Sequence, residues 1–308
     1  MRVSSHQAIE QTIARLQAQT SLIGELQDQI SSGLRLTRPS QDPVAYLEVR
    51  NGHSLATQLD TYSSNVQHAE STLDAGVHAL QHVNDILTRA AEIASEGSNA
   101  STDDAGYVAL AGEVDELIKR LLDTVNAKHD GRYLFSGTAA DTPSFVVTAS
   151  DPSGKPVQIT YQGGIERART LVGPDQTVDS LYTGDHTFQK PGLDVFQSLI
   201  GLRDDLRNPA FDLSARAQAV SQRLDAIQRS ADSTRQTMGE QAVSLESLRA
   251  LSNRFSDIKL ATQTRTSELE STDIAAAIVR LQEQQNLFQS TLGIAAKLFG
   301  PSLLDFIR

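Results

Sequence analysis

The apolar residues at the two ends of the chain follow the same helical rhythm. Across residues 271–299, apolar side chains recur at alternating steps of four and three, and only Gln285 interrupts the series. Residues 5–36 repeat these steps. Such spacing places the side chains along one narrow side of a helix, where a partner helix can pack. The two terminal helices are therefore predicted to pair. The terminal seam residues expected to form the interface are Ile9, Ile13, Leu16, Ile23, Ile30, Leu34, Ile274, Ile278, Leu281, Phe288, Leu292 and Phe299.

The same spacing predicts further helices inside the chain. One begins near residue 43 and is broken at residues 97–99, the next has its seam over residues 107–125 after N-cap candidates at 101–104, and two more cover 195–206 and the stretch from 213 onward. Pro39 ends the first helix, because proline disfavours helical backbone in the residue before it. Asp42 is the expected N-cap of the next helix, with Pro43 in its first turn.

The helical stretch from residue 213 onward carries the same spacing. Gly239 is a possible bend within it, and the pattern resumes beyond that glycine. We expect this stretch to continue directly into the C-terminal helix. Gly300 and Pro301 are expected to end that helix.

The periodicity changes after Gly131. Short strand-like pieces follow, separated by turn signals such as residues 151–154, 163–164 and 173–175. The sequence therefore predicts a mainly α fold, a long heptad-patterned helical bundle or coiled coil with paired N- and C-terminal helices and a small inserted β-rich domain. The strand-like pieces are 132–136, 145–148, 157–161, 168–172 and 177–182.

The pattern divides the chain into three expected domains. Residues 1–40 and 268–308 would form a terminal coiled-coil domain. Residues 41–135 and 192–267 would form a helical rod domain, and residues 136–191 a β-rich domain.

Composition narrows the function classes. Of the 308 residues, 5% are aromatic and none is Trp, which favours long helices with thin seams over a bulky core. The net charge of -11 argues against a nucleic-acid partner, because phosphate binding needs clustered Lys and Arg. The lack of Cys excludes disulfides, thiolate zinc sites and cysteine nucleophiles. No apolar stretch is long enough to predict a membrane span, and the N-terminus lacks the apolar core of a secretory signal.

Candidate chemistry is sparse. His78 and His82 are four residues apart on a helix, a spacing that can hold a metal, but both lie off the seam and no Glu follows His78. Residues 154–156 resemble a phosphate loop only in part, and a turn between strands explains them better. The acidic pairs at 103–104 and 204–205 are best explained as caps and solvated helix faces. We therefore expect no enzyme activity, no metal and no cofactor.

The seams have two explanations. Within one chain, they could all be satisfied in an autonomous bundle, which suits the inner helices. Each terminal helix has only one narrow stripe, and such a pair alone in water would be marginal. Copies of the same chain would supply the missing burial.

Three motifs together resemble the flagellin superfamily, and within it the hook-filament junction proteins. Residues 30–36 (ISSGLRL) are similar to the family's hSSGhRh motif, where h is apolar. Residues 38–45 (RPSQDPVA) resemble the xPSDDPxx link, with Gln41 where the family often has Asp. Residues 131–138 (GRYLFSGT) resemble the segment that enters the outer domain. Residues 143–145, 184–188 and 302–307 also have the look of junction proteins.

The resemblance implies a structural component of the bacterial flagellum that joins the hook, via hook-associated protein 1, to the flagellin filament. Such proteins act outside the cell and are exported unfolded without a cleaved signal peptide. Their paired termini line the channel and their β domain faces outward. The implied partners are hook-associated protein 1, flagellin, copies of the chain itself, and an export chaperone that binds the C-terminal region.

From this we hypothesise that the terminal seams are disordered in the free subunit and fold on assembly. Three alternatives stay open. A minor flagellin would form part of the filament itself. An unrelated coiled-coil scaffold would share the seams without the three motifs. An enzyme could occupy the β insertion, which would require a deep polar pocket with convergent acid and base groups.

Overall fold

The structure of the protein is a computed structural model that describes residues 2–99 and 102–304. The chain divides into two compact units. The terminal unit consists of Met1–Leu59 and Asp257–Arg308, and the middle unit is Asp60–Ser256. The expected three-domain division stays a prediction.

Long helices dominate both units, as the seam pattern predicted. No described helix is apolar over enough length to cross a membrane. The helices are α1 (Arg2–Ser32), α2 (Pro43–Gly97), α3 (Asp104–Val125), α4 (Gly184–Phe188), α5 (Val195–Arg207), α6 (Leu213–Glu270) and α7 (Ile274–Leu304).

Aspartate side chains cap the starts of α2, α3, α5, α6 and α7. The Ala45 amide donates to Asp42 Oδ1 over 3.1 Å at the start of α2, which confirms the predicted cap. The Gly106 amide donates to Asp103 Oδ1 over 2.8 Å at the start of α3. Asp104, the other member of that acidic pair, accepts from Arg216.

The prediction that α6 continues directly into α7 was wrong. The helix stops at Glu270, whose carbonyl accepts from the Arg35 amide, and the Thr272 amide donates to the Gly33 carbonyl over 2.9 Å. These bonds between residues 33–35 and residues 270–272 replace helical bonds. Gly33 adopts the positive φ of 71° that the backbone requires at this point. Asp273 then caps the start of α7.

The predicted end of the last helix was also wrong. α7 continues through Gly300 and Pro301 to Leu304. Proline removes one backbone donor from a helix, a cost that does not always end it.

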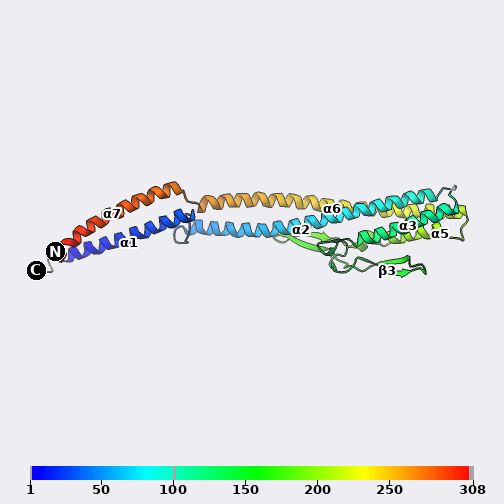
Figure 1. Ribbon diagram of the computed structural model, residues 1–308, viewed down its shortest axis with the longest axis horizontal. Coiled ribbons are helices and arrows are strands. Elements are labelled where there is room, and N and C mark those ends of the chain that lie inside the picture. The colour runs from blue at the N-terminus through cyan, green and yellow to red at the C-terminus, as the bar shows by residue number, and fades with distance from the viewer. Residues whose placement is uncertain (1, 100–101, 305–308) are drawn as a thin grey trace. The chain divides into compact units, whose positions relative to one another are not determined.

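The core of the middle unit is built on the predicted seams. The apolar residues that recur along α2 at helical spacing are buried from Val66 to Ala94, and Tyr62 before them is half-buried. Those of α3 are all buried: Tyr107, Ala111, Val114, Ile118, Leu121 and Val125. α3 packs along α5 (Figure 1). Phe135, Phe145 and Phe196 extend this core into the β-rich segment, where ring centroids of the last two lie 5.1 Å apart.

The β-rich segment consists of separate two-stranded antiparallel pairs within the middle unit. The predicted strand at 132–136 is shorter than expected, and Ser136 instead forms an isolated bridge with Thr183. The other four predicted strands are present. The pairs are β1 (Lys128–His129) with β2 (Arg132–Tyr133), β3 (Phe145–Ser150) with β4 (Pro156–Tyr161), β5 (Ala168–Gly173) with β6 (Gln176–Leu181), and β7 (Gln189–Lys190) with β8 (Leu193–Asp194).

A charged cluster fastens the β3–β4 hairpin to the helices. Asp115 of α3 lies 2.5 Å from Lys155 Nζ and 2.6 Å from Arg207 Nη2. The buried Arg203 lies 3.5 Å from Asp115, and its Nη1 donates to the Pro156 carbonyl over 2.8 Å. Asp204 pairs with the same guanidinium. The cluster therefore joins α3, α5 and the hairpin turn.

Candidate assembly surface

The two terminal helices pair along their length. α1 and α7 lie side by side in the terminal unit (Figure 1). On α1, Leu26 is buried, and on α7, Ala277 and Ala295 are buried. Gln19 Nε2 donates to Thr291 Oγ1 over 3.3 Å and marks the same shared face. The predicted pairing of the chain ends is confirmed, but small and polar side chains supply much of the contact.

The structure divides the terminal seam residues into two groups. The first group is partly buried and lies on the positions that repeat with Leu26 and Ala277. The second group is exposed by 37–48%. Ile9 and Phe299 fall outside the side chains that the structure describes. The first group is Leu16, Ile23, Ile30, Leu281 and Phe288, and the second is Ile13, Leu34, Ile274, Ile278 and Leu292.

In the described part of the terminal unit, exposed large apolar side chains outnumber buried apolar side chains. Of 20 large apolar side chains exposed in the described residues, 13 lie in this smaller unit. Contiguous exposed apolar surface marks interaction sites. The 13 are Ile13, Leu22, Leu34, Val44, Leu47, Leu55, Leu260, Ile274, Ile278, Val279, Leu287, Leu292 and Ile294. The buried apolar residues of the unit are Leu26, Leu36, Ala45, Val49, Leu59, Ala277 and Ala295.

The terminal unit has a second apolar surface. It is a groove of about 460 Å³ between α2 and α6, lined by Leu55, Ile258 and Leu269. Glu48 and Arg265 form an ion pair of 2.8 Å at its edge. Leu55, Ile258 and Leu269 lie on the apolar spacing that predicted these helices, but that spacing did not predict that they would line an open groove.

A serine and a histidine lie close together beside the β-rich segment. Ser71 Oγ lies 2.9 Å from His129 Nε2 beside a cavity of about 320 Å³. Asp130 Oδ2 lies 3.6 Å from the same nitrogen. In a catalytic triad the carboxylate instead binds the opposite ring nitrogen and orients the histidine toward the serine. This geometry therefore does not build the acyl-transfer machinery.

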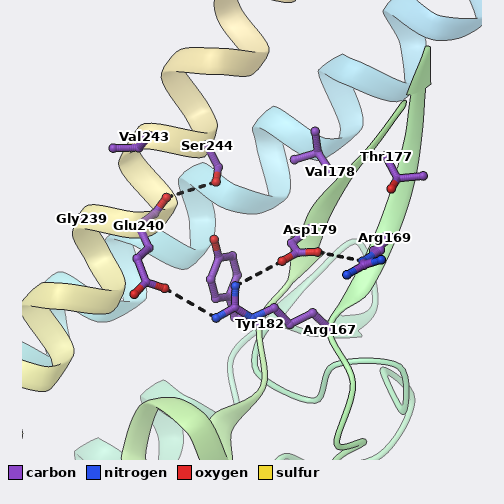
Figure 2. Close-up of a pocket in the computed structure, with 10 residues that line it drawn as sticks. All are labelled: Arg167, Arg169, Thr177, Val178, Asp179, Tyr182, Gly239, Glu240, Val243 and Ser244. Atoms are coloured by element: carbon purple, nitrogen blue, oxygen red, sulfur yellow. Dashed lines mark hydrogen bonds and ion pairs between the residues drawn. The ribbon is translucent and has the colours of Figure 1, made fainter. Parts of the chain in front are cut away.

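One hollow of the middle unit is lined by mutually paired charges. It measures about 750 Å³ and lies between the β5–β6 hairpin and α6 (Figure 2). Arg167 lies 3.2 Å from Asp179 and 3.5 Å from Glu240, and its guanidinium stacks 4.4 Å from the Tyr182 ring centroid. Arg169 lies 3.2 Å from the same Asp179. These pairs position the hairpin on the helix.

The two histidines considered for a metal have other surroundings. His78 lies 3.5 Å from Asp74 and 3.2 Å from Gln81, and His82 is exposed. In the described residues, no three metal-binding side chains gather at one place.

Two side chains of the β-rich segment have shifted pKa values with structural causes. Burial raises the pKa of Tyr161 to about 12. The Tyr161 hydroxyl donates a hydrogen bond to the Gly164 carbonyl over 2.8 Å. The Lys155 amide, with that of Ser153, donates to Asp151 and holds the pKa of that carboxyl below its usual value. Residues 151–155 thus form a turn, as expected for the segment that resembles a phosphate loop.

Comparison with known proteins then identifies the helical framework. The model of the bacterial flagellin N-terminal helical region matches residues 3–140. The chain has the flagellin-like helical fold. It is similar to flagellar hook-associated protein 3 of Escherichia coli K12, at 26% identity over 332 residues, covering 100% of both chains.

Other relatives extend the comparison. Flagellin FljO of Caulobacter vibrioides is 24% identical over 253 residues, covering 76% of this chain and 90% of the flagellin. The crystal structure of the flagellar junction protein FlgL from Legionella pneumophila superposes with a TM-score of 0.59 at 16% identity, covering 72% of this chain and 100% of that one. This low identity supports the shared fold alone. The flagellin-like helical architecture is thus common to both kinds of relative.

Proposed function

We propose that this chain is a structural subunit of the bacterial flagellum, located at the junction between the hook and the filament. The observation that carries the proposal is the end-to-end match with hook-associated protein 3, which leaves no part of either chain uncovered. Flagellin FljO covers only 76% of this chain, and a Bacillus subtilis flagellin covers 94% at 23% identity.

The mechanism we propose is folding coupled to assembly. The terminal unit buries only a few apolar side chains and exposes many, so it gains burial when another subunit packs against it. The exposed group of terminal seam residues, including Ile278 and Leu292, would contact neighbouring subunits. The partly buried group, including Leu281 and Phe288, would hold α1 and α7 together.

The contrast with the middle unit supports this division of labour. Leu80, Leu87 and Leu121 are fully buried within one chain. The middle unit therefore has a core of its own, whereas the terminal pair has a thin seam that includes Gln19 and Thr291.

Before assembly, a partner would cover the exposed face of α7. We assign this role to an export chaperone that binds the C-terminal region as an amphipathic helix in a groove. The chain would then be exported without cleavage of a signal peptide and would act outside the cell. Hook-associated protein 1 on one side, flagellin on the other, and copies of the chain itself would be its neighbours.

A minor flagellin is the second candidate, because flagellins are among the relatives. The two functions differ in where the chain is found. A filament subunit would be distributed along the filament and would polymerise into long fibres when purified.

The test is to delete the gene, restore it with an epitope insertion at the β3–β4 turn, and locate the epitope by immunogold electron microscopy. We expect label only between hook and filament, and hooks without attached filaments in the deletion strain. Label along the filament, or long fibres from the purified chain, would instead establish the flagellin alternative. Co-purification with hook-associated protein 1 would separate both from an unrelated scaffold.

A further inference from the structure

One stretch of α6 in the middle unit carries polar side chains where a helix of this kind normally packs with apolar ones. Before it, Val220 and Ile227 are fully buried, and after it, Leu245 and Leu248 are buried. Between them, most inward positions are polar and at most 8% exposed, and the apolar exceptions are the buried Ala231 and the partly buried Met238. The polar inward residues, the polar segment of α6, are Ser230, Ser233, Thr234, Thr237 and Gln241.

The hydroxyl groups of this segment bond back to their own helix. Thr234 Oγ1 donates to the Ser230 carbonyl over 2.9 Å, and Thr237 Oγ1 donates to the Ser233 carbonyl over 3.2 Å. Such back-bonding competes with the backbone ladder and weakens or bends a helix. Ser233 Oγ and Gln241 Oε1 are buried without a hydrogen-bond partner. The segment therefore gains little from its burial and pays a desolvation cost.

A glycine of the opposite helix faces the polar segment. Gly76 of α2 lies against Gln241, and a Cβ atom at that glycine would approach Gln241 Oε1 to 2.7 Å. Helices resist sliding when side-chain ridges of one fill grooves of the other. A glycine facing short hydroxyl side chains and one long amide provides fewer such obstacles.

The outer side of the same stretch is open as well. The hollow of about 750 Å³ beside the β5–β6 hairpin is lined by Gly239 and Val243, and Val243 is 72% exposed (Figure 2). Arg167 crosses this hollow to Glu240, at 3.5 Å. On this side the Arg167–Glu240 ion pair ties the segment to the hairpin, and on the α2 side Arg235 Nη1 donates to Asn84 Oδ1 over 3.3 Å.

We propose that residues 230–241 form a compliant segment built into α6, which opens and shifts along α2 more readily than the helix on either side. The Arg167–Glu240 ion pair limits this motion by coupling the segment to the β5–β6 hairpin. This consequence rests on the proposed function above: in a junction between two polymers, such a segment would let a subunit adapt its length without losing its core.

Amide hydrogen exchange on the purified full-length chain tests the proposal independently of any role in the flagellum. We expect peptides covering 230–241 to exchange roughly tenfold faster than peptides covering 217–228 and 244–255 of the same helix. Equal protection across the three regions would overturn the proposal.

Substitutions then distinguish the polar segment from ordinary helix fraying. Thr234→Val with Thr237→Val keeps the side-chain shape and removes both hydroxyls, and should slow exchange of 230–241 by roughly tenfold. Thr264→Val is the matched control, because Thr264 makes the same back-bond at an exposed position of α6. If the double variant slows exchange of residues 230–241 no more than this control does, the polar segment of α6 is not the cause of the fast exchange.

The ion pair is tested by a surface change that does not touch the core. Glu240→Gln removes the charge that Arg167 contacts and should increase exchange in both 230–241 and the β6 strand. Unchanged exchange in both segments would overturn the limiting role of the ion pair.

Discussion

The substitution Ile278→Asp tests the exposed face of α7 without changing the face that packs against α1. Ile278 is 41% exposed, whereas Leu281, on the same helix, is partly buried toward α1. A charge at Leu281 or Ile23 would break the terminal pair itself and would confuse pairing with assembly. A charge at Ile278 leaves the pair and the middle unit in place and alters only the surface offered to a neighbour.

The magnitude follows from the exposed fraction. Full burial of an isoleucine is worth about 1.5–3 kcal/mol, so covering the remaining 41% is worth about 0.6–1.2 kcal/mol. Placing an unpaired carboxylate in that contact costs roughly 3 kcal/mol more. The total of about 4 kcal/mol corresponds to roughly a thousandfold weaker subunit contact. In the free chain, the free energy of unfolding of the middle unit should change by less than about 0.5 kcal/mol.

The assay counts filaments attached to hooks in a deletion strain that expresses the variant. We expect few or no attached filaments with Ile278→Asp and normal attachment with Gln282→Asp, which places the same charge at an exposed polar position of α7. Urea unfolding followed by circular dichroism checks that the middle unit is intact. Normal attachment with Ile278→Asp would refute the assignment of this face to subunit contact.

Two further predictions concern the middle unit. Asp115→Asn should lower the free energy of unfolding by about 2–4 kcal/mol in urea denaturation, because Arg203 and its neighbours lose their shared carboxylate. Asp123→Asn, at an exposed site of the same helix, should change it by less than about 0.5 kcal/mol, and equal effects would contradict the anchoring role of the cluster. The raised pKa of Tyr161 stabilises the fold fully below pH 10, and this contribution should be lost as pH rises toward about 12, because the unfolded tyrosine ionises first. Tyr161→Phe should remove this part of the pH dependence of the free energy of unfolding. An unchanged pH dependence between pH 10 and 12 would contradict the assignment to Tyr161.

The positions of the helices and strands were readable from spacing, because one buried face imposes a strict period. The α2 seam from Leu59 to Ala94 is an example. The break after Glu270 was not readable, since it depends on backbone bonds to the distant Gly33 and Arg35. Local periodicity carries no information about such a partner.

The face on which the terminal helices pair was only partly predictable. Hydrophobicity selects the most apolar stripe, and on α7 that stripe includes Ile274 and Ile278. The structure buries Ala295 of that stripe, but it also buries Ala277 outside it, because small side chains allow helices to approach closely. The more apolar residues stay exposed, which a reading based on burial within one chain could not anticipate.

The most direct test of the central claim compares amide exchange of α1 and α7 in the free subunit and in the assembled junction. The account predicts little protection of both helices in the free chain at micromolar concentration, less than roughly tenfold, with a strongly protected core at Leu80, Leu87 and Leu121. On assembly, both terminal helices should become as protected as that core. Strong protection of α1 and α7 in the free subunit would contradict folding coupled to assembly.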